Sequence, residues 1–96
     1  MNSESIGERI FLITKKLPFE ENARNHVRAS AVEIATKYLN KLSENEERST
    51  LDVALSAVYL SCLKSDMKIS QTQLASAVSN GLNRWPCVVI DMNKRL

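Results

Sequence analysis

The last third of the chain carries polar and basic side chains that could hold phosphates or read base edges. They are Gln71, Thr72, Gln73, Asn80, Asn83, Arg84, Lys94 and Arg95. Lysine and arginine pair with phosphate oxygens, and amide and hydroxyl groups bond phosphates or base edges. The stretch predicts a short helix, a turn at Asn80-Gly81 and a second helix, which is the order of a helix-turn-helix. Any tightly packed helix pair needs the same spacing, so the pattern alone leaves both interpretations open.

The charge distribution modestly favours a C-terminal end that faces nucleic acid. Residues 64–96 carry five basic and two acidic side chains, and residues 1–63 carry eight and nine. The last third is therefore +3 and the remainder −1, although the whole chain is only +2. The last helix is short and offers few side chains that could read bases, and Asp91 on it would repel phosphate. Sequence discrimination should therefore be modest, with most of the affinity coming from phosphate contacts.

The residues that could do other chemistry do not form a recognisable site. No nucleophile elbow and no glycine-rich phosphate loop occurs, so an enzyme is not expected, and no cofactor is implied. Cys62 and Cys87 are far apart and lack partners for a metal, and His26 should be solvated. Both cysteines are expected to be reduced thiols of a cytoplasmic or nuclear protein. Trp85 could stack on a base, but sealing the rim of the core is the favoured role.

Composition and periodicity predict one all-α domain with five helices. The 96 residues are 44% hydrophobic and include only two glycines and two prolines. Helical spacing of apolar residues predicts helices over residues 5–16, 20–42, 50–63, 70–78 and 84–96. Leu17-Pro18 should end the first helix, residues 43–49 form a polar loop, and Asn83 could cap the last helix. Val88, Val89, Met92 and Leu96 should face inward. The longest nearly apolar run, residues 53–63, is too short to span a bilayer.

The third helix is expected to lie at the centre. "STLD" matches a capping box, with Ser49 as the cap and Asp52 reaching back, and "SQTQ" at Ser70 is a second such signal. In "LDVALSAVYLSCL" apolar residues from Leu51 to Leu63 point in nearly every direction, so other helices should enclose this one. Small residues would let those neighbours approach closely: Ala54, Ser56, Ala57 and Ser61.

Two stretches resemble the cyclin-like core repeat of the general transcription initiation factor B family, which includes archaeal factor B and eukaryotic factor IIB. They are "LPFEENARNHVRASAVEIATKYLNKL" and, more strongly, "ERSTLDVALSAVYLSCLKSDMKISQTQLASAVS". The residues at corresponding places are Arg48, Ser49, Ala54, Ala57, Tyr59, Cys62, Leu74 and Ala75. The similarity covers about residues 6–96, and order and spacing carry it rather than one motif. Glu47, Leu63 and Lys68-Ile69-Ser70 depart from the family pattern, and the 96 residues contain neither its zinc ribbon nor its second repeat.

The resemblance implies a single cyclin-like repeat over residues 1–96, a five-helix bundle with a C-terminal helix-turn-helix. It implies a monomeric DNA-binding transcription initiation module that contacts promoter DNA and TATA-binding protein, with RNA polymerase as a further partner. Its place would be the archaeal cytoplasm or the eukaryotic nucleus, with no membrane contact. The alternative is a cyclin-fold module for protein–protein interaction without DNA binding. Its surface would be the groove beside the third helix and the acidic loop of Glu44, Glu46 and Glu47.

Overall fold

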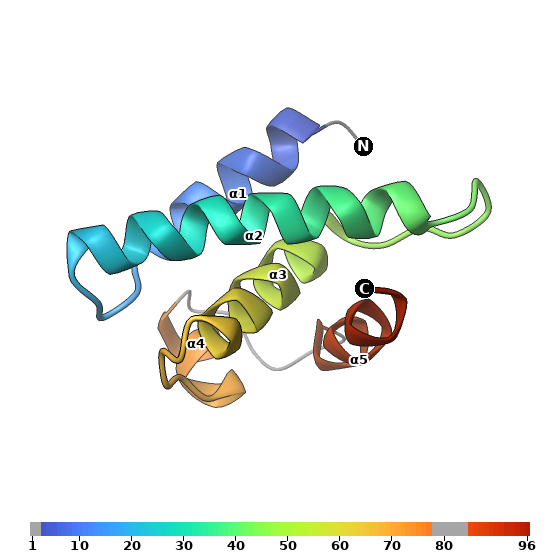
Figure 1. Ribbon diagram of the computed structural model, residues 1–96. Helices are drawn as coiled ribbons and strands as arrows, with labels where there is room; N and C mark the ends of the chain where they lie inside the picture. Colours follow the sequence, from blue (N-terminus) through green and yellow to red (C-terminus); the bar gives the residue numbers. More distant parts are fainter. Residues whose placement is uncertain (1–2, 78–84) are drawn as a thin grey trace.

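The chain is all-helical in the part that the structure describes. The computed structural model describes residues 3–77 and 85–96, and these ranges contain five helices and no strand (Figure 1). The helices are α1 (Ser3–Lys15), α2 (Glu21–Lys41), α3 (Thr50–Lys64), α4 (Gln71–Ala77) and α5 (Trp85–Arg95). The predicted all-α class with five helices is confirmed.

The turn between α1 and α2 forms as the proline predicts. The helix ends at Lys15, one residue before the expected end, and Leu17 is buried just ahead of Pro18. The amides of Lys16 and Leu17 donate to the carbonyls three residues before them, at 3.1 and 3.2 Å. These shorter-span bonds satisfy two carbonyls that the end of the α-helix would otherwise leave free.

The α3 helix packs against all four other helices. In Figure 1 it runs below α2, and α4 and α5 lie on the side of α3 away from α2. Every residue from Val53 to Cys62 is buried except Tyr59, which is half-buried. The expectation that Leu63 also faces other helices is wrong, because its side chain is 51% exposed. Leu63 lies in the last turn of α3, on a side that the described neighbours leave open.

Small residues in α3 allow neighbouring main chains to come within hydrogen-bonding distance. The Ser61 hydroxyl donates to the Val27 carbonyl of α2 at 3.0 Å. The Ser56 hydroxyl lies 2.9 Å from the Trp85 carbonyl of α5 and 2.7 Å from the Asp52 carbonyl of its own helix. Both serines are fully buried, so these bonds satisfy hydroxyl groups that would otherwise destabilise the core.

The end of α3 has the hydrogen bonds of a Schellman motif. Asp66 has a positive φ of 57°, and its amide donates to the Leu63 carbonyl at 3.2 Å. The Met67 amide donates to the Cys62 carbonyl at 2.8 Å. Glycine is the usual residue at the left-handed position, but aspartate adopts it more readily than most residues do. This turn reverses the chain and leads it to α4.

The α5 helix contributes one buried edge to the core. Trp85, Val88, Val89 and Met92 are buried, as predicted for the last three. The prediction that Leu96 faces inward is wrong, because it lies just beyond the helix and is 44% exposed. No helix among the described residues is both long enough and apolar enough to cross a membrane.

Candidate nucleic-acid interface

The first turn of α4 carries three of the residues predicted to contact DNA. Thr72 and Gln73 are exposed, and Gln71 is half-buried. The Ser70 hydroxyl accepts a bond from the Gln73 amide at 3.0 Å, and Gln73 Oε1 accepts one from the Ser70 amide at 2.8 Å. Both halves of the predicted capping box therefore form. The side-chain oxygen Oε1 of Gln73 is used to cap the start of α4. The side-chain nitrogen Nε2 of Gln73 is therefore left for another partner.

Residues 78–84, which precede α5, lie outside the described residues. Asn80, Asn83 and Arg84 are among them, so their predicted DNA contacts and the predicted cap at Asn83 stay predictions. Pro86 occupies the first turn of α5, as predicted. Proline is tolerated there because the first amides of a helix have no partner within it.

The start of α5 is anchored in the core by Trp85. Its side chain is fully buried and meets the Tyr59 ring edge-on, with centroids 5.9 Å apart and planes at 68°. The Trp85 carbonyl accepts the bond from Ser56. A ring enclosed in this way cannot stack on a base, so the favoured core role of Trp85 is confirmed.

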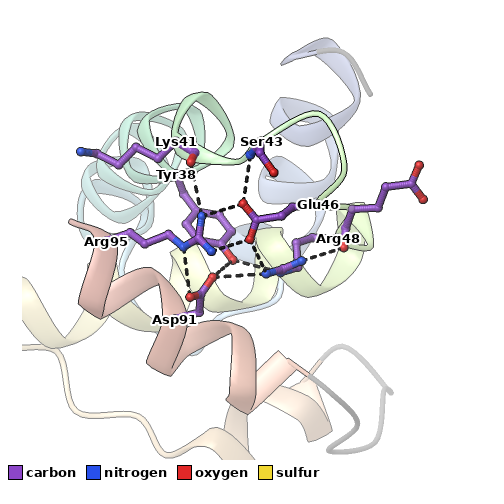
Figure 2. Close-up of polar contacts among 8 residues, drawn as sticks. Tyr38, Lys41, Ser43, Glu46, Arg48, Asp91 and Arg95 are labelled. Carbon is purple, nitrogen blue, oxygen red and sulfur yellow. Dashed lines mark hydrogen bonds and ion pairs between the residues drawn. The ribbon is translucent and has the colours of Figure 1, made fainter.

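The end of α5 is held by Arg95, another residue predicted to contact DNA. The Arg95 guanidinium bonds both carboxylate oxygens of Glu46, at 2.5 and 3.1 Å (Figure 2). Its Nε donates to Asp91 at 3.1 Å, and Nη1 donates to the Lys41 carbonyl at 3.3 Å. The Arg95 side chain is 27% exposed. It therefore ties α5 to the end of α2 and to the loop that follows α2.

A second arginine, Arg48, belongs to the same cluster and lies in the loop just before α3. Arg48 donates from Nε to the Tyr38 hydroxyl at 3.2 Å and lies 3.5 Å from Asp91 and 3.6 Å from Glu46. The Tyr38 hydroxyl in turn donates to Asp91 at 2.5 Å (Figure 2). We call Tyr38, Glu46, Arg48, Asp91 and Arg95 the ionic cluster. Its two acids and two arginines balance in charge.

The cluster favours the ionised forms of its two acids. The hydrogen bond from Arg95, and then the bond from the Ser43 amide, lower the pKa of Glu46 to about 2. The hydrogen bond from Tyr38 lowers the pKa of Asp91, with Arg95 and Arg48 contributing. Burial raises the pKa of Tyr38, and its bond to Asp91 adds to this. Both carboxylates are therefore charged at neutral pH, and the tyrosine is a neutral donor.

The cluster distinguishes the two cations that were predicted together. The charge of Arg95 is compensated by Glu46 and Asp91, whereas no ion pair joins the exposed Lys94 to an acid in the described ranges. Sequence reasoning missed this cluster. The spacing of Asp91 and Arg95, four residues apart on a helix, is a usable signal for their pair. Nothing in the polar loop signals that Glu46 and Arg48 face α5.

An apolar groove lies between the last turns of α3 and the exposed side of α5. It has a volume of about 450 Å³. Its lining consists of Leu60, Leu63, Lys64, Val89, Ile90, Asn93 and Lys94. We call it the α3–α5 groove. Leu63 and Ile90 are 51% and 60% exposed, whereas Leu60 and Val89 are nearly buried beneath them.

A second hollow, here called the basic depression, shares Lys64 with the α3–α5 groove. It is lined by Ser30, Glu33, Ile34, Lys37, Lys41, Lys64 and Leu96. Glu33 pairs with Lys37 at 3.0 Å across one turn of α2. The two hollows together bring four lysines and one glutamate to adjoining surfaces, which gives a net charge of +3 around exposed leucine and isoleucine side chains.

The groups that could perform other chemistry are dispersed in the described part of the chain. No group of three histidine, cysteine or acidic residues that could hold a metal ion occurs there. His26 is exposed, as predicted. Cys62 is buried, and burial raises the pKa of its thiol to about 11, which keeps it protonated and unreactive at neutral pH. Cys87 is exposed and free.

The residues that carry the family resemblance have structural roles here. Arg48 belongs to the ionic cluster, and Ser49 caps α3 by accepting from the Asp52 amide at 3.4 Å. The predicted return bond to the Asp52 carboxylate does not form, so only half of the capping box predicted at Ser49 is present. Tyr59 packs on Trp85. The other five are buried, namely Ala54, Ala57, Cys62, Leu74 and Ala75. A five-helix bundle of another family could use the same residue types in these roles, so the resemblance stays a prediction.

Comparison with known proteins adds no relative to this picture. No protein-family model, no curated protein and no solved structure matches the chain.

Proposed function

We propose that this chain is a cyclin-like repeat of the transcription initiation factor B type that binds duplex DNA through α4 and α5. The order and spacing of residues from Arg48 to Ala75 support the family. The packing of α3 against all four other helices is consistent with the central helix of that arrangement. The capped α4, followed by an α5 with exposed Asn93 and Lys94, is the observation that carries the DNA-binding function.

The proposal assigns the phosphate contacts to lysines rather than to Arg95. Lys64 and Lys94 are exposed and border the same groove, whereas Arg95 is engaged by two carboxylates. If each lysine neutralises one phosphate, they contribute about −1.8 to the slope of log affinity against log salt, at about −0.9 per phosphate. Arg84, which lies outside the described residues, would add its own contribution.

An NMR titration of the whole chain with a promoter duplex at low salt tests this function. Amide shifts should change for residues 71–73 and 90–95, and Lys64→Ala with Lys94→Ala should flatten the salt slope and weaken binding to all duplexes alike. The matched control is Lys15→Ala with Lys16→Ala, which removes two exposed lysines at the end of α1. Absence of binding at low salt, or an equal loss in the control, would contradict the proposal.

The protein partners implied by the family are part of the same proposal. A titration with TATA-binding protein, alone and with duplex present, should shift amides of this chain if it acts as a factor B repeat. RNA polymerase is the further partner, and the archaeal cytoplasm or the eukaryotic nucleus is the proposed location. If the chain binds duplex but does not bind TATA-binding protein, the DNA-binding function is retained and the family assignment is removed.

A second candidate function is a helical module for protein–protein interaction without DNA binding. The α3–α5 groove favours it, because it exposes Leu63 and Ile90 where a DNA backbone would offer no apolar surface to cover them. The acidic loop is a weaker candidate surface than expected, since Glu46 is already bonded to Arg95.

A further inference from the structure

We propose that the α3–α5 groove binds the apolar face of an acidic amphipathic helix from a partner protein. This inference rests on the protein-interaction function proposed second, and it neither requires nor excludes DNA binding.

The apolar lining of the groove provides the anchoring surface. Leu63 and Ile90 project from two different helices, and nearly buried Leu60 and Val89 lie beneath them. Leu96, which is 44% exposed, lies in the adjoining basic depression. Three of the five large hydrophobic side chains that are exposed among the described residues are thus on adjoining surfaces. Covering them with apolar side chains removes a contiguous apolar area from water, which is the main driving force of such association.

The charges around the groove favour a partner with negative charge. Lys64 and Lys94 line the groove itself, and Lys37 and Lys41 line the depression beside it. The single acid in these two linings, Glu33, is already paired with Lys37. A basic segment would therefore meet like charge on this surface, whereas carboxylates would find lysines without ion pairs in the described ranges.

A helix is the segment that presents both chemistries in the required arrangement. Side chains three and four residues apart lie on one face, so two or three apolar residues can fill the groove together. Carboxylates on either flank of that face then point toward Lys64 and Lys94. The volume of about 450 Å³ accommodates a few side chains, so one short helix is sufficient.

The other exposed apolar patch lacks this combination and supplies a control. On α1 the Phe11 ring is partly covered by Arg28 of α2, whose guanidinium lies 4.4 Å from the ring centre. Leu12 is 52% exposed, but Glu8 and Arg9 line the same hollow with opposite charges. Arg9 also lines a second hollow beside Leu12, together with Lys16. The two hollows at this patch carry a net charge of +1, compared with +3 around the α3–α5 groove and the basic depression.

The test uses the whole chain and three synthetic peptides of equal length in NMR and calorimetric titrations. The first is a helix with leucines on one face and glutamates beside them. The second has the same composition in an order without an apolar face, and the third replaces glutamate by lysine. Only the first should bind, and the shifted amides should cluster at residues 60–64 and 89–94.

Variants test which side chains carry the binding. Leu63→Ser and Ile90→Ser should each weaken binding of the acidic amphipathic peptide about tenfold or more, as expected for anchor residues. Leu12→Ser, which changes an equally exposed leucine outside the groove, should leave it unchanged. Lys64→Glu with Lys94→Glu should reduce binding of the acidic peptide and permit the basic one. Both serine changes should leave duplex binding unaltered, which separates this inference from the DNA-binding function.

Several results would overturn the inference. If the second peptide, which has no apolar face, binds as tightly as the first, charge alone accounts for the binding. If Leu12→Ser weakens binding as much as Leu63→Ser does, the site lies elsewhere. Concentration-dependent dimerisation that Ile90→Ser abolishes would show that a second copy of this chain covers the groove. No binding of any peptide, with the fold intact by NMR, would remove the proposal and leave the DNA-binding function untouched.

Discussion

Neighbouring residues on the two sides of α5 have opposite roles. Asp91 and Arg95 face the end of α2 and its following loop, where they belong to the ionic cluster. Ile90 and Lys94, each one residue earlier in the sequence, lie at the α3–α5 groove and are exposed. One side of the helix is committed to holding the fold, and the other is available to a partner. Adjacent residues in a helix can thus differ in role because each step along the sequence turns the side chain by about 100°.

This difference bears directly on the proposed functions. A cation with two carboxylate partners has little charge left for phosphate, so Arg95 is a poorer DNA contact than Lys94. The groove on the free side of α5 combines Ile90 and Lys94 of that helix with Leu63 and Lys64 of α3. The same surface therefore serves the DNA-binding proposal through its charge and the peptide-binding proposal through its apolar side chains.

The largest effect is expected from breaking the anchored side at Trp85. Trp85→Ala should lose about 3–5 kcal/mol of unfolding free energy, because it empties a fully buried site between α3 and α5. Cys87→Ala, an exposed position in the same turn, should change stability by less than about 0.5 kcal/mol. Urea denaturation measures both. Similar midpoints for the two variants would mean that α5 does not dock through Trp85.

The next effect contrasts two neighbouring cations. Arg95→Ala should lower the thermal midpoint, because it leaves Glu46 and Asp91 without their main partner. Lys94→Ala should leave the midpoint unchanged, since no described acid pairs with that lysine. The loss should remain well below that of Trp85→Ala, because partly exposed ion pairs are screened by solvent. A thermal midpoint that falls equally in both variants would contradict the assignment of Arg95 to the fold and of Lys94 to the open surface.

Acid should weaken the cluster in a defined window. The folded pKa values of Glu46 and Asp91 are depressed, so their stabilising contribution is complete above the ordinary carboxyl pKa and is lost as pH falls through the folded value. For Glu46 that window runs from about 4.5 down to about 2. Thermal midpoints should therefore fall more steeply over this range in the natural chain than in Glu46→Gln. Parallel pH profiles would show that Glu46 does not contribute.

The smallest effect is expected on the open side. Ile90→Ser should change stability by no more than about 0.5 kcal/mol, because the side chain is already 60% exposed. Val89→Ser, its buried neighbour, should lose more, on the order of 1.5–3 kcal/mol. Guanidinium denaturation compares the two. A large loss in Ile90→Ser would show that the groove is part of the core and not a binding surface.

Much of the fold follows from local signals in the sequence. Apolar spacing predicts the five helices, Pro18 marks the first boundary, and the serines at 49 and 70 mark two helix starts. These features depend on backbone chemistry within a few residues, so a single sequence contains them. The exposed positions of Leu63 and Leu96 are the exceptions, because hydrophobicity gives a tendency to be buried and not the extent of the neighbouring helices.

The sequence by itself determined the class of the fold, the capped helix starts and the small residues through which α3 admits its neighbours. Only the tertiary structure decided which charged and apolar residues remain free. Glu46 and Arg95 are 49 residues apart in the chain and meet through folding, as do Leu63 and Ile90 at the groove. Local periodicity carries no information about such contacts, because they depend on how helices distant in sequence cross one another.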